Sequence, residues 1–297
     1  MKKKLKSNTT FGSLLFDILN YAFLIFLCFI TLYPMYYVLV ASLSDSTMLK
    51  MNPGALWWPY DFTTGAYRLA FSHPLLLSGY KNILIIMAIS LPINIILTLF
   101  CAFFLASKNM LFKKPIAIII LFTMFFNGGM IPTYLNIRAL GLYDSLWALI
   151  LPGAMSVYNA IIYKTSIETI PESLMDSAKI DGANDITVLF RIIFPLIKPT
   201  TAVLLLYYGI GHWNSWFPAS LYIEDNYKLP IQNVLRAVLI ANSNILNSAA
   251  TDMDQINDFA ESIKYAAIII TTVPVLIIYP FLQKYFVKGV MIGAVKG

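Results

Sequence analysis

Hydrophobic residues form six long stretches that contain no Asp, Glu, Lys or Arg. These stretches are Ile18–Ser44, Asn82–Ser107, Pro115–Ile137, Ser145–Tyr163, Pro199–Ile223 and Tyr265–Gln283. Each holds at least 19 residues, and a helix needs roughly 20 apolar residues to cross the bilayer core. The stretches do not show the ten-residue alternating units of barrel strands. The pattern therefore predicts an all-α membrane protein with six transmembrane helices.

Composition agrees with this prediction, and charge gives its orientation. Of the 297 residues, 59% are hydrophobic and 12% are charged, whereas about 25% are charged in soluble domains. With the N-terminus inside, 14 of the 21 Lys and Arg fall in inner segments and seven in outer segments. Basic residues favour the cytoplasmic side, so both termini are expected to be cytoplasmic. The net charge of +6 then reflects membrane orientation, and no nucleic-acid partner is expected.

The inner segment Lys164–Lys198 differs from the short basic inner segment Ser107–Lys114, which is expected to be a simple hairpin. Pro171 can open a helix at its first position, and Leu174 and Ala178 would share one face of that helix. Asp181-Gly182 would then end it.

A second short helix is expected after that break. Asn184 or Asp185 can cap it, and apolar residues follow at helical spacing, at Ile186, Leu189 and Ile193. The sequence therefore predicts a helix-turn-helix at the cytoplasmic surface.

The outer segment Glu224–Lys264 is long and acidic, and its Ala237–Thr251 portion is apolar but rich in Asn. Such a portion is a poor membrane span and suits an amphipathic segment that touches the membrane surface or a soluble partner. Asp252, Asp254 and Asp258 are the candidate docking charges. A solvated acidic loop without a partner is the alternative.

The sequence lacks the motifs of an ATPase and of the common enzyme classes. No Gly-Lys dipeptide occurs, which excludes a phosphate-binding P-loop. No H-E-x-x-H, cysteine cluster or G-x-S-x-G occurs either, so no catalytic residue and no metal site are expected. Cys28 and Cys101 lie inside spans and are expected to be small packing residues.

A membrane protein of this kind would need its driving force from a partner. Ion-driven carriers normally bury charged groups in the membrane, and the six stretches contain none. His212 could line a pathway, but a lone His near a span end is more often a hydrogen-bonded interfacial residue. A partner could dock on the inner helix-turn-helix, because a short amphipathic helix suits a groove on a soluble protein.

The inner segment also carries an extended motif. It reads Pro171-Glu172-Ser173-Leu174-Met175-Asp176-Ser177-Ala178-Lys179-Ile180-Asp181-Gly182-Ala183-Asn184, followed by Phe190 and Ile193-Phe194-Pro195-Leu196. This run resembles the EAA loop of binding-protein-dependent ABC importers, whose form is E-A-A-x-x-D-G-A followed by I-x-[LF]-P. Asp176-Ser177-Ala178 stands where the family has Glu-Ala-Ala.

The resemblance implies that this loop is a coupling helix seated in a cleft of an ATPase subunit. Its coupling residues would be Glu172, Asp176, Ser177, Ala178, Lys179, Asp181, Gly182, Ala183 and Asn184. It also implies a type I ABC importer permease fold, with a transmembrane domain over residues 15–290 that includes the coupling loop 165–198 and the outer loop 224–264. Residues 1–14 and 291–297 would be cytoplasmic.

Other parts of the chain extend the resemblance, from Leu32-Tyr33-Pro34 through Gly128–Tyr134 and Leu140-Gly141-Leu142 to Trp213-Asn214. They are similar to the MalG-like permease subunit of maltose-type importers, in the branch for complex oligosaccharides. The implied partners are a second permease, two ATPase subunits that hold ATP and Mg, and an extracellular solute-binding protein in a bacterial cytoplasmic membrane. This chain itself would bind no cofactor.

An oligosaccharide path through the spans would use polar and aromatic side chains. The candidates are Asn127, Tyr134, Trp213, Asn214 and Trp216, and helix–helix packing is the alternative role for them. Three other functions stay open from the residues alone: a permease for another solute class, an autonomous secondary carrier, and a scaffold subunit that transports nothing.

Overall fold

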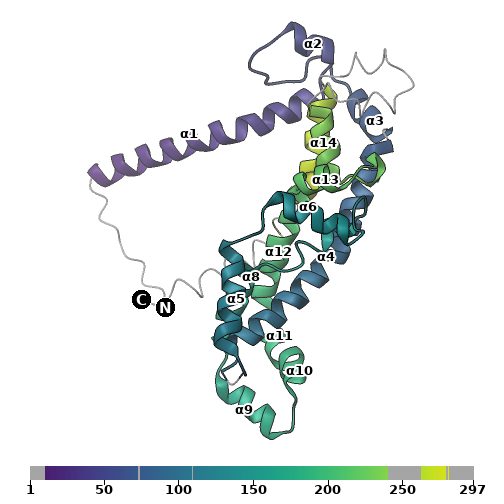
Figure 1. Ribbon diagram of the computed structural model, residues 1–297. Coiled ribbons are helices and arrows are strands. Elements are labelled where there is room, and N and C mark those ends of the chain that lie inside the picture. The colour runs from purple at the N-terminus through teal and green to yellow at the C-terminus, as the bar shows by residue number, and fades with distance from the viewer. Residues whose placement is uncertain (1–10, 73, 109, 240–261, 279, 281–297) are drawn as a thin grey trace. The chain divides into compact units, whose positions relative to one another are not determined.

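A computed structural model describes residues 11–72, 74–108, 110–239, 262–278 and 280 of the chain (Figure 1). All the regular secondary structure in these residues is helical, which confirms the all-α prediction. The chain divides into two compact units. Unit 1 is Met1–Ser72 with Thr251–Ile269, and unit 2 is His73–Ala250 with Ile270–Gly297.

Unit 1 is dominated by the long helix α1 (Phe11–Ser42). Among its residues only Val40, Ala41 and Ser42 are buried, so nearly the whole helix presents apolar side chains outward. Such a surface is expected of a helix that faces lipid. The helix begins seven residues before Ile18, where the charge-free stretch starts. Asp17 limits that stretch but lies within the helix.

The C-terminal end of α1 meets two short helices, α2 (Ser46–Met51) and α3 (Gly65–Ser72). Asp45 caps α2, because its Oδ1 accepts hydrogen bonds from the backbone N–H groups of Thr47 and Met48 at 2.9 and 3.1 Å. A small apolar cluster fills this corner, and its buried members are Val40, Ala41, Leu49 and Leu56.

Unit 2 holds most of the remaining described helices. They are α4 (Pro74–Ala106), α5 (Lys113–Phe125), α6 (Met130–Ala139), α7 (Trp147–Ile150), α8 (Val157–Ile167), α9 (Glu172–Ile180), α10 (Asp185–Thr187), a π-helical turn (Val188–Ile193), α11 (Phe194–Leu196), α12 (Lys198–Asn214), α13 (Phe217–Tyr222), a 3-10 turn (Asn226–Lys228) and α14 (Ile231–Leu239). Helices α8, α12 and α14 all pack against α4. Figure 1 shows α9 and α10 at one end of this unit and α14 toward the other.

One further helix, Ser262–Ile278, is apolar. Its residues to Ile269 belong to unit 1 and those from Ile270 to unit 2. It covers most of the predicted sixth stretch, whose end lies outside the described residues.

Two of the described helices, α1 and α4, are long and apolar enough to cross a membrane, and the number rises to four if each of two bent helix pairs is one span. The predicted third span is such a pair, because α5 and α6 meet at 111°. Gly128 and Gly129 lie at the bend, and Gly129 has φ +85°, a non-helical backbone conformation directly before α6. The predicted span over Pro115–Ile137 is therefore not one continuous helix.

The predicted fourth and fifth spans are also broken. Pro152-Gly153 separates α7 from α8, and α8 then runs beyond the predicted end at Tyr163 to Ile167 because a lysine on the helix does not end it. The fifth stretch is interrupted at Ser215, which has extended backbone between α12 and α13. Hydropathy counts apolar residues but does not register these backbone breaks.

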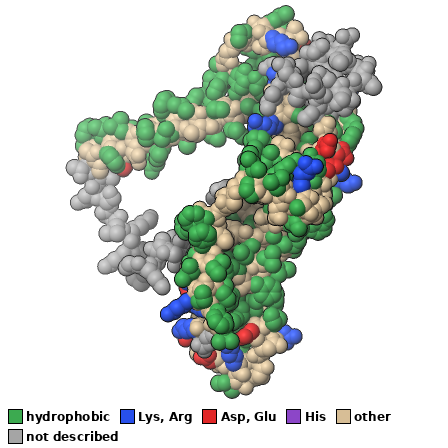
Figure 2. Space-filling model, in the orientation of Figure 1, with side chains coloured by type: hydrophobic (Ala, Val, Ile, Leu, Met, Phe, Trp, Pro, Cys, Tyr) green, Lys and Arg blue, Asp and Glu red, His purple; other side chains and the backbone are tan. Residues whose placement is uncertain are grey.

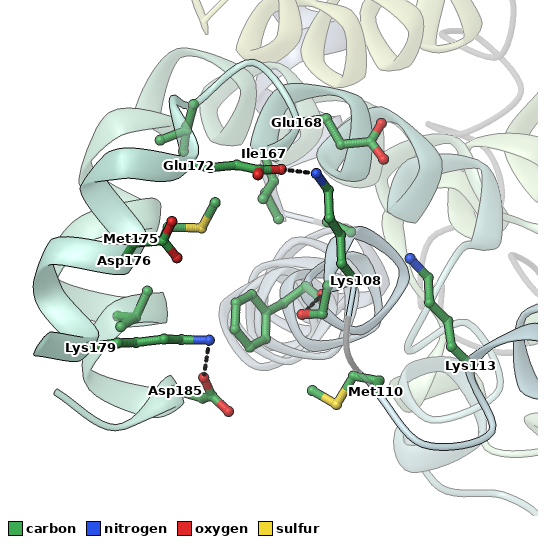
Figure 3. Close-up of a pocket in the computed structure, with 15 residues that line it drawn as sticks. Lys108, Met110, Lys113, Ile167, Glu168, Glu172, Met175, Asp176, Lys179 and Asp185 are labelled. Atoms are coloured by element: carbon green, nitrogen blue, oxygen red, sulfur yellow. Dashed lines mark hydrogen bonds and ion pairs between the residues drawn. The ribbon is translucent and has the colours of Figure 1, made fainter. Parts of the chain in front are cut away.

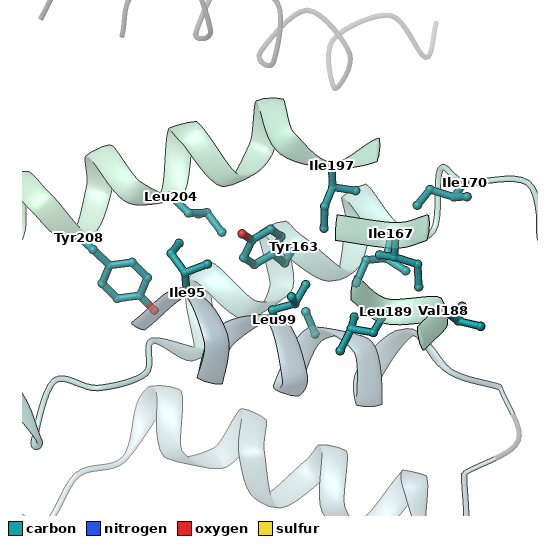
Figure 4. Packing of buried hydrophobic residues seen from close by; sticks show 12 residues of the cluster. Ile95, Leu99, Tyr163, Ile167, Ile170, Val188, Leu189, Ile197, Leu204 and Tyr208 are labelled. Atoms are coloured by element: carbon teal, nitrogen blue, oxygen red, sulfur yellow. The ribbon is translucent and has the colours of Figure 1, made fainter. Parts of the chain in front are cut away.

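The main core of unit 2 joins α4, α8 and α12 to the π-helical turn (Figure 4). Its innermost side chains include Leu99, Tyr163, Leu189, Ile193 and Leu204, all with less than 2% of their surface exposed. Leu189 and Ile193 thus lie inward as predicted. The prediction that Ile186 shares their face was wrong, because Ile186 is 55% exposed and lies before the helix widens into its π-helical turn.

Candidate functional site

The inner helix-turn-helix is present, and α9 is its first helix. Pro171 lies directly before α9 with extended ψ, so the helix begins at Glu172, one residue later than predicted. Proline suits this boundary because its φ is fixed and it has no N–H to satisfy.

A Schellman motif ends α9. Gly182 has φ +84°, a conformation that favours glycine. Its N–H donates to Lys179 O at 3.0 Å, and the N–H of Ala183 donates to Ala178 O at 2.9 Å. This is the hydrogen-bond pattern of a helix closed by a left-handed residue. The Asp-Gly-Ala portion of the motif is therefore a helix stop with a defined exit direction.

Asn184 starts the second helix. Its Oδ1 accepts a hydrogen bond from the N–H of Thr187 at 2.8 Å, which makes it the N-cap that the sequence had left open between Asn184 and Asp185. The Asp185 carboxylate instead lies 3.6 Å from Lys179 Nζ. This ion pair connects the two helices across the turn.

The inward face of α9 is apolar. Met175 and Ala178 pack against the main core, whereas Leu174 is 46% exposed. The spacing of Leu174 and Ala178 predicted a helix with both on one face, but it did not indicate that the packed side of the helix carries Met175 with Ala178, because residues three apart also share a face. Asp176 and Ser177 are exposed.

Apolar side chains remain uncovered on the outside of the helix-turn-helix. Leu174 is 46% exposed, Ile180 86% and Ile186 55%. Charged side chains are also concentrated at this end of unit 2, as Figure 2 shows. An exposed surface that mixes apolar and charged groups is typical of a protein–protein contact site.

A cleft of about 630 Å³ lies between α9 and the hairpin that joins α4 to α5 (Figure 3). Lys108 projects from the hairpin and forms an ion pair with Glu172. The hydrogen bond to Glu172 and its charge raise the pKa of Lys108. The connection between α4 and α5 is short, as predicted, and Lys108 also attaches it to α9. Sequence reasoning missed Lys108 because its partner is 64 residues away.

Of the five candidate path residues, Trp213 is the most buried, with 6% of its surface exposed. Its Nε1 donates to the backbone oxygen of Thr271 at 3.3 Å, and its ring lies 6.2 Å from that of Tyr80. Asn127 is exposed at the break between α5 and α6, where its Oδ1 accepts from Gly129 N at 3.0 Å. Asn214 is exposed at the end of α12.

The other two candidates lie at the two ends of α13. Tyr134 on α6 stacks with Tyr222, the last residue of α13, at 6.2 Å between ring centroids. Trp216, which precedes α13, lies under the guanidinium of Arg236 at 3.8 Å. Tyr134 and Trp216 thus lie at opposite ends of α13.

His212 is hydrogen-bonded, as predicted. Its Nε2 lies 2.9 Å from Asn94 Oδ1. Asn94 donates through its amide nitrogen to the backbone oxygens of Gly153 and Ala154 at 2.8 and 2.9 Å, so Oδ1 is its acceptor and His212 Nε2 is the donor. The pair supports the broken backbone between α7 and α8.

Asp144 forms a polar clamp that the sequence did not reveal. It lies between α6 and α7, and its Oδ1 accepts from the N–H groups of Glu224 and Asp225, both at 3.0 Å. Its Oδ2 lies 2.6 Å from Lys228 Nζ. The Asp225 N–H and then Lys228 hold the pKa of Asp144 below its usual value. The clamp joins two segments that charge assigns to the outer side.

The three candidate docking residues, Asp252, Asp254 and Asp258, lie outside the described residues.

Comparison with known proteins gives consistent matches. Residues 62–292 match the family described as binding-protein-dependent transport system inner membrane component. The chain is 38% identical over 290 residues to the polygalacturonan/rhamnogalacturonan transport system permease protein YtcP of Bacillus subtilis (strain 168), which covers 95% of this chain and 99% of that protein. It is 39% identical over 293 residues to protein LplC of the same organism, covering 98% and 97%.

Among solved structures, one chain of a bacterial ABC transporter involved in the import of the acidic polysaccharide alginate matches with a TM-score of 0.86 and 28% identity. The match covers 94% of this chain and 99% of that chain.

Proposed function

The chain belongs to the binding-protein-dependent transport system inner membrane components, and from this membership we propose that it is the permease subunit of an ATP-driven importer that carries oligosaccharides across the bacterial cytoplasmic membrane. This membership confirms the resemblance to binding-protein-dependent importers that the sequence indicated. The oligosaccharide is inferred from YtcP and from the alginate importer, whose names state polysaccharide transport.

The observation that carries the proposal is the coupling loop. Its first helix is closed by a Schellman motif at Gly182 and its second is capped by Asn184, so the exposed side chains of the loop have fixed directions. Leu174, Ile180 and Ile186 remain open for a partner. We expect this surface to enter the cleft of an ATPase subunit, since a short helix in a groove is a common recognition mode.

Packing supports a mechanical role for the loop. Met175 and Ala178 of α9 contact the same core as Leu189 and Ile193, and that core continues into α4, α8 and α12. A displacement of α9 by the ATPase would therefore move these helices together, because packed interiors resist compression. Such coupled motion would switch the permease pair between inward-open and outward-open states.

We further propose six membrane spans with both termini in the cytoplasm. This arrangement makes spans of α1, α4, the bent pair α5 and α6, the broken segment through α7 and α8, α12 with α13, and the helix from Ser262. The 14-to-7 division of basic residues supports the orientation.

The proposed complex contains a second permease, two ATPase subunits with ATP and Mg, and an extracellular binding protein. Asp252, Asp254 and Asp258 remain the proposed docking charges for the binding protein, and this chain would bind no cofactor itself.

Affinity purification from the source membranes tests the proposal. An ATPase and a second permease should co-purify, and the reconstituted complex should hydrolyse ATP faster with its sugar-loaded binding protein. Oligosaccharide uptake by this chain alone would instead identify an autonomous carrier. Uptake of another solute class by the complex would leave the permease role and correct the substrate.

A further inference from the structure

Arg236 and Trp216 form a close cation–π pair. The guanidinium carbon lies 3.8 Å from the centroid of the indole ring, a distance that an approach from the ring edge could not reach without a clash. Arg236 therefore covers a face of the ring.

The geometry of this pair is built by α14. Asn233 lies three residues before Arg236, so both share one side of the helix. The Asn233 amide donates to Trp216 O and to Ser220 Oγ, both at 2.9 Å. Helix α14 packs closely against α4. A Cβ atom added to Gly79 of α4 would lie only 3.1 Å from the Cα atom of Ile231 in α14. The position of Trp216 is therefore fixed by the fold.

A second arginine–aromatic group lies at the other end of α13. The guanidinium carbon of Arg138 lies 5.2 Å from the Tyr143 ring centroid and 5.9 Å from that of Tyr134. Tyr134 stacks on Tyr222, the last residue of α13, and Trp216 precedes its first residue. Six residues of helix separate these two positions by about 9 Å.

Both arginines can bind an anion. Each is exposed, and in the part of the chain that the structure describes neither forms an ion pair with a carboxylate, whereas nearby Lys228 is paired with Asp144. Contact with a ring uses the face of the guanidinium and leaves N–H donors in its plane. These donors match the two oxygens of a carboxylate.

We propose that Arg236 on Trp216 and Arg138 on Tyr134 and Tyr143 form a recognition site for the carboxylate groups of an acidic oligosaccharide at the outer side of the permease. The proposal rests on the proposed function and adds its substrate class. The aromatic rings hold the two guanidinium groups in place, and each arginine binds one sugar carboxylate through two hydrogen bonds. A neutral sugar of equal length has no carboxylate for the arginines to bind.

The test uses the co-purified importer in proteoliposomes with its binding protein. The probes are tetragalacturonate and its fully methyl-esterified form, which have the same sugars with and without charge. R236Q and R138Q should each lower subsaturating uptake of tetragalacturonate about tenfold, the effect of losing a charge-assisted hydrogen bond. Uptake of the ester should change by less than about twofold.

Two further variants separate recognition from general charge and from folding. R236K keeps the charge without the planar donors and should give an intermediate loss. Lys81 is an exposed base of α4 in the described structure, and K81Q should leave both uptakes unchanged. Co-purification of the partner subunits reports assembly, and R138Q and R236K provide the result if R236Q does not assemble.

Equal losses for the two probes in the arginine variants would overturn the proposal and make Arg236 a structural support for Trp216. A wild-type importer that carries neutral oligosaccharides but not tetragalacturonate would also overturn it and leave the proposed function intact. Failure of the proposed function is distinct, because no ATPase would then co-purify and no oligosaccharide would be imported.

Discussion

Lys108 forms an ion pair with Glu172, and this contact joins the hairpin after α4 to the first residue of α9. Both side chains are more than half exposed, at 72% and 58%, so water and salt screen the pair and it adds little to stability. Its position matters more than its strength. It attaches α9 to the hairpin after α4, in addition to the apolar contacts of Met175 and Ala178 with the main core.

We expect Lys108→Gln to reduce coupling without unfolding the protein. The thermal midpoint in detergent should stay unchanged, while the number of substrate molecules imported per ATP should fall, because α9 could then tilt without moving α4. The charge exchange Lys108→Glu with Glu172→Lys should restore the ratio. Lys113 lines the same cleft, and Lys113→Gln is the matched control. A wild-type ratio in Lys108→Gln at low salt would contradict the expectation.

Gly182 offers a test of the helix stop. Its φ of +84° is unfavourable for a residue that has a Cβ atom. Gly182→Val should therefore impose a backbone penalty of about 1–3 kcal/mol and change the direction of the second helix. ATPase co-purification and transport-coupled ATP hydrolysis should both fall.

Gly141 provides the matched control for this experiment. It has φ +69°, and a Cβ at either glycine would meet no atom within 4 Å. Gly141→Val should therefore carry a similar backbone penalty outside the coupling loop and retain ATPase binding. If both variants assemble and transport normally, the Schellman stop is not needed for coupling.

Local signals in the sequence were sufficient for the coupling loop but not for its surroundings. Asp181-Gly182 and Asn184 affect only backbone groups about one helical turn away in the sequence. Their roles as helix stop and helix cap could therefore be predicted. The packed face of α9 depends on where the main core lies, and the spacing of Leu174 and Ala178 did not indicate that Met175 packs there. Gly128-Gly129 can break a helix, but the spans were predicted from stretches without charged residues, and glycines do not affect that criterion.

The contacts that the sequence could not indicate join distant segments. Asp144 and Lys228 are 84 residues apart, and no motif connects them. The same holds for Arg236 and Trp216, which meet only because α14 returns to α13. Both pairs depend on the tertiary path of the chain.

Asp144 should make stability depend on pH. Its pKa is lowered in the folded state by the Asp225 N–H and by Lys228, so its contribution is present above the unfolded pKa and is lost as pH falls through the folded pKa. Asp144→Asn should therefore lower the thermal midpoint at pH 7, and the gap to wild type should close as pH falls below about 4.

Asp61→Asn is the matched control for Asp144→Asn. Asp61 also has positive φ, at 47° compared with 54° for Asp144, so the backbone preference of asparagine affects both variants alike. Only Asp144→Asn should show the pH-dependent gap. A gap that stays constant from pH 7 to pH 3 would show that the Asp144 charge does not stabilise the fold.

The proposed topology predicts which positions reach each side of the membrane. Single cysteines at Lys3, Lys296 and Asp254, on a background without Cys28 and Cys101, can be treated with an impermeant thiol reagent in intact cells. Position 254 should react, whereas positions 3 and 296 should react only after the membrane is opened. Labelling of either terminal position in intact cells would overturn the six-span orientation.

The last prediction concerns the acidic charges of the outer segment Glu224–Lys264. If the binding protein docks there, reversal of Asp252, Asp254 and Asp258 to lysine should weaken its association. The loss should be larger at 10 mM than at 300 mM salt, because the Debye length is about 30 Å at 0.01 M and shortens as salt increases. The readout is ATP hydrolysis by the reconstituted complex, titrated with binding protein at both salt concentrations. Glu224→Lys places one reversed charge on the exposed start of the same segment and should have a smaller effect. Half-saturation of the triple variant equal to wild type at both salt concentrations would mean that the segment is a solvated loop and that docking uses other residues.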